Sequence, residues 1–134
     1  MSLGYRKNIA WQKNQEAIVK TAGLIEKLPR VTPYNKIADQ LFASIASVGA
    51  NIAEGYSDFK GNEYQRYLKI SLRSAYETDH WLITLHALSN GRSGKINEEQ
   101  LQEINNLNIE TIKILKKTIE SIKKKRAGEK QGLE

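Results

Sequence analysis

Two stripes of residues run side by side through residues 37–54, and they differ completely in polarity. Both stripes repeat at intervals of three and four residues, which is the spacing of one face of an α-helix. A helix with these two faces lies between two environments. One is the apolar core of its own subunit, and the other is a neighbouring helix, a neighbouring subunit or water. The apolar stripe consists of Ile37, Leu41, Ile45, Val48 and Ile52, and the polar stripe consists of Gln40, Ser44, Ser47, Asn51 and Glu54.

The residue types of the polar stripe favour a packed contact over a solvated face. A helix face in water normally carries lysine, arginine and glutamate, whereas this stripe is rich in serine and amide side chains. Small residues nearby, namely Ala43, Ala46, Gly49 and Ala50, allow a second helix to approach closely. We therefore interpret the stripe as an oligomer contact or an internal structural contact, with a wet face as the alternative.

Three further helices are predicted from apolar periodicity and from signals at the helix ends. The four helices are expected at about 8–28, 33–55, 62–89 and 97–126. The second is predicted to begin with Thr32 as its N-cap and Pro33 at its first position. The fourth is predicted to have Asn97 as its N-cap, between the two apolar residues of a hydrophobic staple, Ile96 and Leu101.

Short connections between long helices favour antiparallel neighbours. We therefore expect residues 1–134 to form a single all-α domain, an up-down-up-down antiparallel four-helix bundle. A turn is predicted at Asn90-Gly91 and Ser93-Gly94, between the third and fourth helices. Residues 1–4 and 128–134 show no periodicity and are expected to fray.

Composition argues against several classes of function. The chain has no cysteine, so it can form neither a disulfide nor a thiolate metal site. It has no charged-then-apolar leader and no run of about eighteen apolar residues. We therefore expect no membrane-spanning segment and a cytoplasmic location.

Candidate catalytic and metal-binding groups are sparse. Glu77 and His80 match the Glu-x-x-His step of di-metal bundle enzymes, but the step occurs once, and His86 lacks the matching glutamate. Glu54 and Glu63 flank the turn between the second and third helices, where capping of helix ends is a simpler explanation than acid–base catalysis. The glycines do not form a phosphate-binding loop. We expect a non-enzymatic protein without a metal or cofactor.

Positive charge is concentrated near the two ends of the chain. Residues 113–126 contain seven basic residues and one glutamate, and their net charge of +6 equals that of the whole chain. On the first helix a row of lysines repeats every seven residues, with Glu16 beside it. Because the first and fourth helices of such a bundle are usually neighbours, the two basic surfaces are candidates to merge and bind RNA or DNA; the alternative is a solvated surface. The residues concerned are Lys13, Lys20, Lys27, Lys113, Lys116, Lys117, Lys123, Lys124, Lys125 and Arg126.

The segment around the polar stripe resembles the signature of a bacterial family, the four-helix-bundle proteins encoded in intervening sequences of 23S rRNA genes. The resemblance covers most of residues 8–125 and includes Trp11, early in the first predicted helix. It is carried by Gln40, Ser47, the run from Asn51 to Gly55, the pair Glu63-Tyr64 and the run from Tyr67 to Glu77.

This resemblance implies a non-enzymatic bundle that assembles into a ring, typically a homopentamer. The family is similar to the accessory variability determinant of diversity-generating retroelements, a basic pentameric barrel that binds nucleic acid and a reverse transcriptase. The resemblance also implies that Gln40, Ser47, Asn51 and Glu54 are buried or lie between subunits.

Two positions depart from the family pattern. The family commonly has basic residues shortly after the glutamine matched by Gln40, where Phe42 and Ala43 stand in this chain. It also commonly has an arginine after the Glu-Gly turn, where residues 57–59 are Ser-Asp-Phe. Binding of nucleic acid, or of a nucleic-acid-bound partner such as a reverse transcriptase, would therefore depend on the basic first and fourth helices. The alternative function is a protein–protein interaction module that does not bind nucleic acid.

Overall fold

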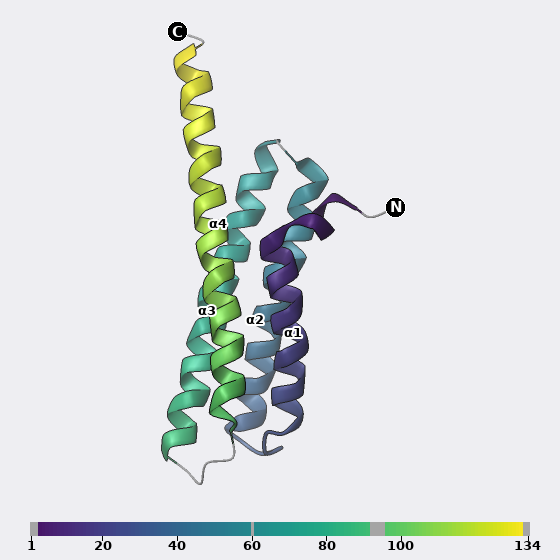
Figure 1. Cartoon of the computed structure of the whole chain (residues 1–134), viewed down its shortest axis with the longest axis vertical. Helices are drawn as coiled ribbons and strands as arrows, with labels where there is room; N and C mark the ends of the chain where they lie inside the picture. Colours follow the sequence, from purple (N-terminus) through teal and green to yellow (C-terminus); the bar gives the residue numbers. More distant parts are fainter. Residues whose placement is uncertain (1–2, 60, 92–95, 133–134) are drawn as a thin grey trace.

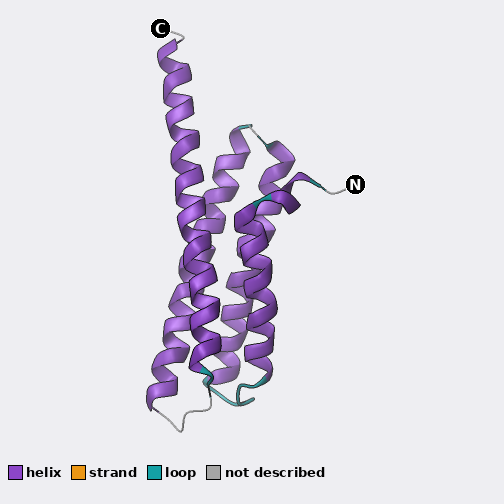
Figure 2. Ribbon diagram, viewed as in Figure 1, coloured by secondary structure: helices purple, strands orange, loops and turns teal. Residues whose placement is uncertain are grey.

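The computed structural model describes residues 3–59, 61–91 and 96–132. These residues form four α-helices, α1 (Ile9–Glu26), α2 (Tyr34–Gly55), α3 (Asn62–Gly91) and α4 (Glu98–Gly132), and two short 3-10 helices, η1 (Gly4–Lys7) and η2 (Tyr56–Asp58). Consecutive helices run antiparallel, and the described part of the chain contains no strand (Figures 1 and 2). The predicted all-α four-helix bundle is therefore confirmed.

Side-chain caps explain where three of the helices begin. The side chain of Asn8 accepts a hydrogen bond from the Trp11 backbone N–H at 2.9 Å, at the start of α1. Asp58 accepts one from the Glu63 N–H at 2.8 Å and so caps α3. Asn97 accepts one from the Gln100 N–H at 3.1 Å, which confirms it as the predicted cap of α4. Each bond satisfies a backbone donor that has no partner within its own helix.

Two predicted helix ends are wrong. Thr32 does not cap α2, because the helix begins at Tyr34 and the residue before it is Pro33, whose backbone is already in the right-handed helical region (φ −87°, ψ −9°). Asn90 and Gly91 do not form a turn, because α3 continues through Gly91. The other two residues of that predicted turn, Ser93 and Gly94, lie outside the described residues.

The predicted fraying of residues 128–132 is also wrong, because α4 continues through Gly132. The segment from Lys123 to Gln131 is rich in lysine, glutamate and other good helix formers, and Gly128 alone costs the helix only about 1 kcal/mol. The final turns of α4 project beyond the other three helices (Figure 1). The basic end of α4 is therefore surrounded by solvent on more sides than the rest of the bundle.

The core is built from the apolar face of each helix. The whole apolar stripe of α2 is buried, with exposed fractions of 9% or less. The buried apolar positions are Ala10, Ala17 and Leu24 of α1 and Leu28 just after it, whereas the parallel stripe that contains Trp11 and Ile18 is only half-buried. Two polar residues, Asn14 and Thr21, complete the buried face of α1, and an apolar pattern does not identify them.

Candidate nucleic-acid interface and polar stripe

The centre of the polar stripe contacts α3 of the same chain. The Ser47 and Ser74 hydroxyls form a hydrogen bond of 2.9 Å, and the Asn51 amide donates to the Ser47 hydroxyl at 3.0 Å. Ser44 is buried and accepts a hydrogen bond from the Thr78 hydroxyl at 2.9 Å. The middle of the stripe is therefore an internal structural contact between α2 and α3, and it is not a wet face.

Other signature residues meet at the same contact. The Ser71 hydroxyl donates to the Val48 carbonyl at 2.7 Å, across the two helices. A Cβ added to Gly55 would lie 3.0 Å from the Tyr67 Cβ and 3.2 Å from the Tyr64 ring, so Gly55 allows these tyrosines to pack against the end of α2. The signature therefore describes how α2 and α3 fit together.

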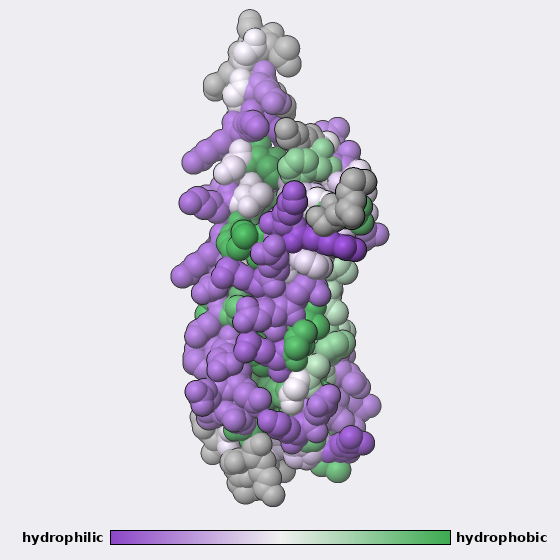
Figure 3. Space-filling model, turned by 45° about the vertical axis from the view of Figure 1, so that its right-hand side comes forward, coloured by the Kyte–Doolittle hydropathy of each residue, from purple (hydrophilic) through white to green (hydrophobic). Residues whose placement is uncertain are grey.

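The outer face of α2 is uncharged between Asp39 and Glu54. Gln40 and Glu54, at the two ends of the polar stripe, are exposed, and no charged residue lies between Asp39 and Glu54. We define the α2 outer face as Gln40, Phe42, Ala43 and Ala50, which are all exposed, with Phe42 at 41%. Figure 3 shows apolar residues along the right-hand edge of the molecule and hydrophilic residues over much of the rest. This face has the composition of a contact surface rather than that of a solvated helix.

Two lysines of the predicted row on α1 are paired with α4. Lys13 lies 2.6 Å from the Glu110 carboxylate, and Lys20 lies 3.2 Å from the Glu103 carboxylate. These pairs confirm that α1 and α4 are neighbours, but they also neutralise most of the row. Lys27 is exposed and forms no ion pair with any other described residue.

The lysines of α4 form the larger free basic surface. The six lysines between residues 113 and 125 are exposed, and none of them lies within ion-pair distance of a carboxylate in the described part of the chain. They begin in the middle of α4 and continue onto its projecting end (Figure 1). This surface, here called the α4 lysines, consists of Lys113, Lys116, Lys117, Lys123, Lys124 and Lys125.

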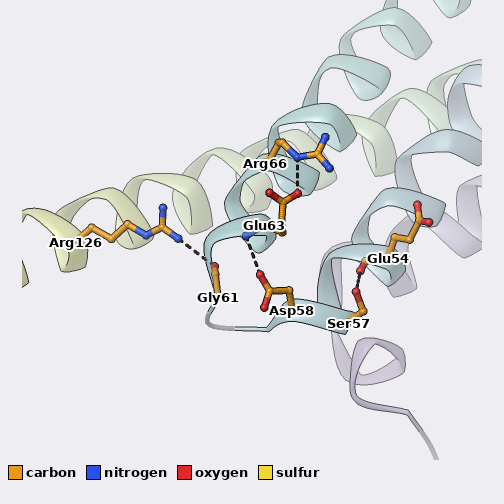
Figure 4. Close-up of polar contacts among 7 residues, drawn as sticks. All are labelled: Glu54, Ser57, Asp58, Gly61, Glu63, Arg66 and Arg126. Atoms are coloured by element: carbon orange, nitrogen blue, oxygen red, sulfur yellow. Dashed lines mark hydrogen bonds and ion pairs between the residues drawn. The ribbon is translucent and has the colours of Figure 1, made fainter.

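Arg126 forms intramolecular hydrogen bonds instead of extending this surface. Its guanidinium donates to the Gly61 carbonyl at 3.0 Å (Figure 4) and to the Gln65 side-chain oxygen at 3.1 Å. The residue therefore fastens the far part of α4 to the beginning of α3. These bonds occupy two of its donors within the chain, and its role as a nucleic-acid contact stays a prediction.

Three basic residues of α3 were missed. Arg66, Lys69 and Arg73 are all exposed on one side of the helix, at spacings of three and four residues. Arg66 is bound to the Glu63 carboxylate at 2.6 Å, and this hydrogen bond raises the pKa of the guanidinium. Lys69 and Arg73 have no carboxylate partner among the described residues. Their spacing of three and four residues is the sequence signal that predicts one basic side of the helix. Most of this segment also belongs to the family signature.

The acidic groups near the α2–α3 turn do not converge on one another in the described part of the chain. Glu63 faces Arg66, whereas the Glu54 side chain points away from the turn (Figure 4). His86 lies 2.7 Å from the Glu98 carboxylate, which also accepts a hydrogen bond from Ser89 at 3.0 Å. Within the described residues, no cluster of three or more histidine, aspartate or glutamate side chains is suited to hold a metal ion.

An aromatic cluster closes the end of the bundle near the α2–α3 turn. The Tyr56 ring stacks on Phe59 with centroids 4.9 Å apart, and it meets the Tyr64 ring edge-on at 5.5 Å. Burial, and secondarily the neighbouring Tyr56, raises the pKa of Tyr64 above its ordinary value. Tyr64 therefore stays neutral at physiological pH and acts as a packing residue.

The comparisons with known proteins agree with this arrangement. The sequence profile of the family described as 23S rRNA-intervening sequence protein matches residues 6–117. A solved structure from Bacteroides thetaiotaomicron, described as a protein with unknown function from the S23 ribosomal protein family, is 28% identical in sequence, with a TM-score of 0.68. That match covers 82% of this chain and 97% of the other.

None of the curated proteins matches the sequence. Across the described residues, every helix is too short or too polar to cross a membrane. The family match spans most of the chain and includes the signature residues at the α2–α3 contact. The chain therefore belongs to the family of 23S rRNA-intervening sequence proteins.

Proposed function

We propose that this protein is a non-catalytic oligomeric scaffold that binds RNA or DNA, or a nucleic-acid-bound partner such as a reverse transcriptase, through α4. The observation that carries the proposal is the contrast between its two basic helices. Lys13 and Lys20 of α1 are paired with glutamates, whereas the α4 lysines have no carboxylate partner among the described residues. Unpaired lysines on a projecting helix are the groups that release counterions when they meet phosphates.

Assembly is supported by the α2 outer face. A solvated helix face of this length normally carries charges, but this one is uncharged and includes the half-exposed Phe42 ring. Burying such a face removes apolar surface from water without breaking an ion pair. The family resemblance implies a ring, typically a homopentamer, and the α2 outer face is our candidate for a subunit contact.

Replacing Lys116, Lys117, Lys123 and Lys124 together by glutamine is expected to weaken binding of a mixed-sequence RNA by at least about 100-fold at low salt. Each lost phosphate contact also lowers the slope of log affinity against log salt, by about 0.7 for a single strand and about 0.9 for a duplex. Fluorescence anisotropy over a range of salt concentrations measures both quantities.

The control is a variant with Arg30 and Lys36 replaced by glutamine, because neither residue is among the predicted nucleic-acid contacts. Both residues are exposed and lie at or near the loop between α1 and α2, at the opposite end of the bundle from the projecting end of α4 (Figure 1). The control is expected to bind RNA almost as well as the unmodified protein. Equal losses in the two variants, or unmodified RNA binding by the α4 variant, would rule out a role for α4 in binding.

Light scattering is expected to give a mass that is a multiple of the 15.2 kDa chain. Replacing Phe42 by glutamate should lower that mass, because the substitution places a charge on the α2 outer face. A second measurement with RNA present tests whether assembly and binding occur together. A monomeric mass for the unmodified protein at all concentrations would contradict the oligomer.

The alternative is a protein–protein interaction module that uses the α2 outer face and does not bind nucleic acid. The same variants distinguish the two functions. If the module is correct, replacing the four α4 lysines leaves partner binding intact, whereas Phe42→Glu abolishes it.

A further inference from the structure

Helices α3 and α4 pack side by side, and we call the strip between their neighbouring outer edges the α3–α4 groove. At its lower end, Ile83 of α3 and Gln102 of α4 line the same depression, which has a volume of about 130 Å³. The antiparallel register is held by the Asn108 amide, which donates to the Ala75 carbonyl at 2.9 Å, and by the hydrogen bonds of Arg126 to the start of α3. Positions on the two helices can therefore be matched step by step from the depression toward the basic end of the bundle.

Seven residues make nearly two full turns, so each such step returns to the same edge and advances by about 10.5 Å. On α3 the steps lead from Ile83 to Tyr76 and then to Lys69. On α4 the corresponding steps lead from Gln102 to Ile109, Lys116 and Lys123. The lower end of the groove is lined by apolar and polar side chains and holds the His86–Glu98 pair. The middle of the groove holds Tyr76, and its upper end has lysines on both sides.

Tyr76 is the residue that gives this groove a distinct chemistry. Its side chain is 50% exposed, which is high for a tyrosine next to a helix–helix contact. On α3, Lys69 lies seven residues before Tyr76. On α4, Ile109 lies opposite Tyr76, and Lys116 follows Ile109 by seven residues. An exposed aromatic ring beside a basic track is the combination that binds single strands, because bases stack on the ring while phosphates meet the lysines.

We propose that the groove between α3 and α4 binds single-stranded nucleic acid, with a base stacked on Tyr76 and phosphates at Lys69, Lys116 and Lys123. This inference rests on the proposed nucleic-acid function and specifies its ligand. A duplex keeps its bases stacked inside the helix, so it offers phosphates to the lysines but no base face to Tyr76. RNA and DNA single strands share the necessary chemistry.

The test compares a 20-nucleotide unstructured RNA, the DNA of the same sequence and the corresponding DNA duplex. Tyr76→Ala is expected to weaken binding of both single strands by about ten-fold, because one stacking contact is lost. The slope against salt should stay unchanged, because no phosphate contact is lost. Lys69→Gln should lower both the affinity and the slope. Duplex binding should be insensitive to Tyr76→Ala.

Tyr76→Phe is the matched control, since it keeps the ring and should bind as the unmodified protein does. Tyr76 and Lys69 are both exposed, so thermal unfolding should confirm that the variants remain folded. If Tyr76→Ala binds single strands normally while the α4 variant loses binding, the groove inference is wrong and the proposed function stands. If the unmodified protein binds none of the three probes, both are wrong.

Discussion

Leu41→Ala is expected to lower the free energy of unfolding by about 2 to 5 kcal/mol. Leu41 is fully buried in the middle of the α2 apolar stripe, in the same cluster as Leu24, Ile45 and Leu85. Truncation removes apolar surface from the core and leaves a cavity that close-packed neighbours cannot fill completely. Since small domains are stable by only about 5 to 15 kcal/mol, this one substitution should bring the protein near its limit of stability.

The next residue provides the control. Phe42 is larger than Leu41 but is 41% exposed, so Phe42→Ala should change the stability of the isolated chain by about 0.5 kcal/mol or less. Urea denaturation at several protein concentrations measures both effects. If the α2 outer face is a subunit contact, Phe42→Ala will lower stability mainly at concentrations where the oligomer forms. Equal losses for the two variants at high dilution would contradict the assigned core.

Gly49→Ala is expected to destabilise the protein by about 1 to 3 kcal/mol, even though alanine is the better helix former. A Cβ at Gly49 would collide with the side-chain oxygen of Asn14 and lie 3.2 Å from the Gln15 amide nitrogen. Asn14 is buried on α1, and its amide donates to the Ile45 carbonyl of α2 at 3.0 Å. Moving the side chain to make room would break a buried hydrogen bond between the two helices.

Gly23→Ala is the matched control, because a Cβ added there meets nothing within 4 Å. This substitution should stabilise the protein by about 0.5 to 1 kcal/mol through helix propensity alone. A double variant with alanine at both Asn14 and Gly49 should lose less stability than the two single variants together, by about 1 kcal/mol, because the collision disappears. Additive losses in thermal or urea unfolding would show that Asn14 is not the obstacle.

The helices and most of their inner faces could be predicted from the sequence because both depend on local signals. The apolar stripe of α2 is fully buried, and Asn97 caps α4 as its sequence neighbours indicate. On α1 two polar residues are buried among the apolar ones. The Thr21 hydroxyl donates to the Ala17 carbonyl of its own helix, whereas the Asn14 amide donates to the Ile45 carbonyl of α2. The partner of Asn14 lies on another helix, so its burial depends on the tertiary fold and could not be predicted from local spacing.

The candidate interface was less predictable, for a related reason. Charge along the sequence indicated basic helices, but pairing between helices decides which lysines remain available. Lys13 and Lys20 are paired with glutamates about ninety residues further along the chain, and Arg126 reaches back to Gly61. These partners are fixed by the rotation and register of each helix, which periodicity leaves undefined. The exposure of Arg66, Lys69 and Arg73 on one side of α3 depends in the same way on how that helix is rotated in the bundle.

The contact between α2 and α3 bears on how relatives should be compared. Ser47, Gly55 and Ser71 act on the partner helix of their own chain, by hydrogen bonding or by leaving room for its side chains. A protein that shares these residues is expected to share the contact between α2 and α3. The likeness says nothing about what that protein binds. The family profile ends at residue 117, before Lys123, Lys124 and Lys125 of α4. Family members can therefore keep the same helix packing and still bind different partners through their exposed surfaces.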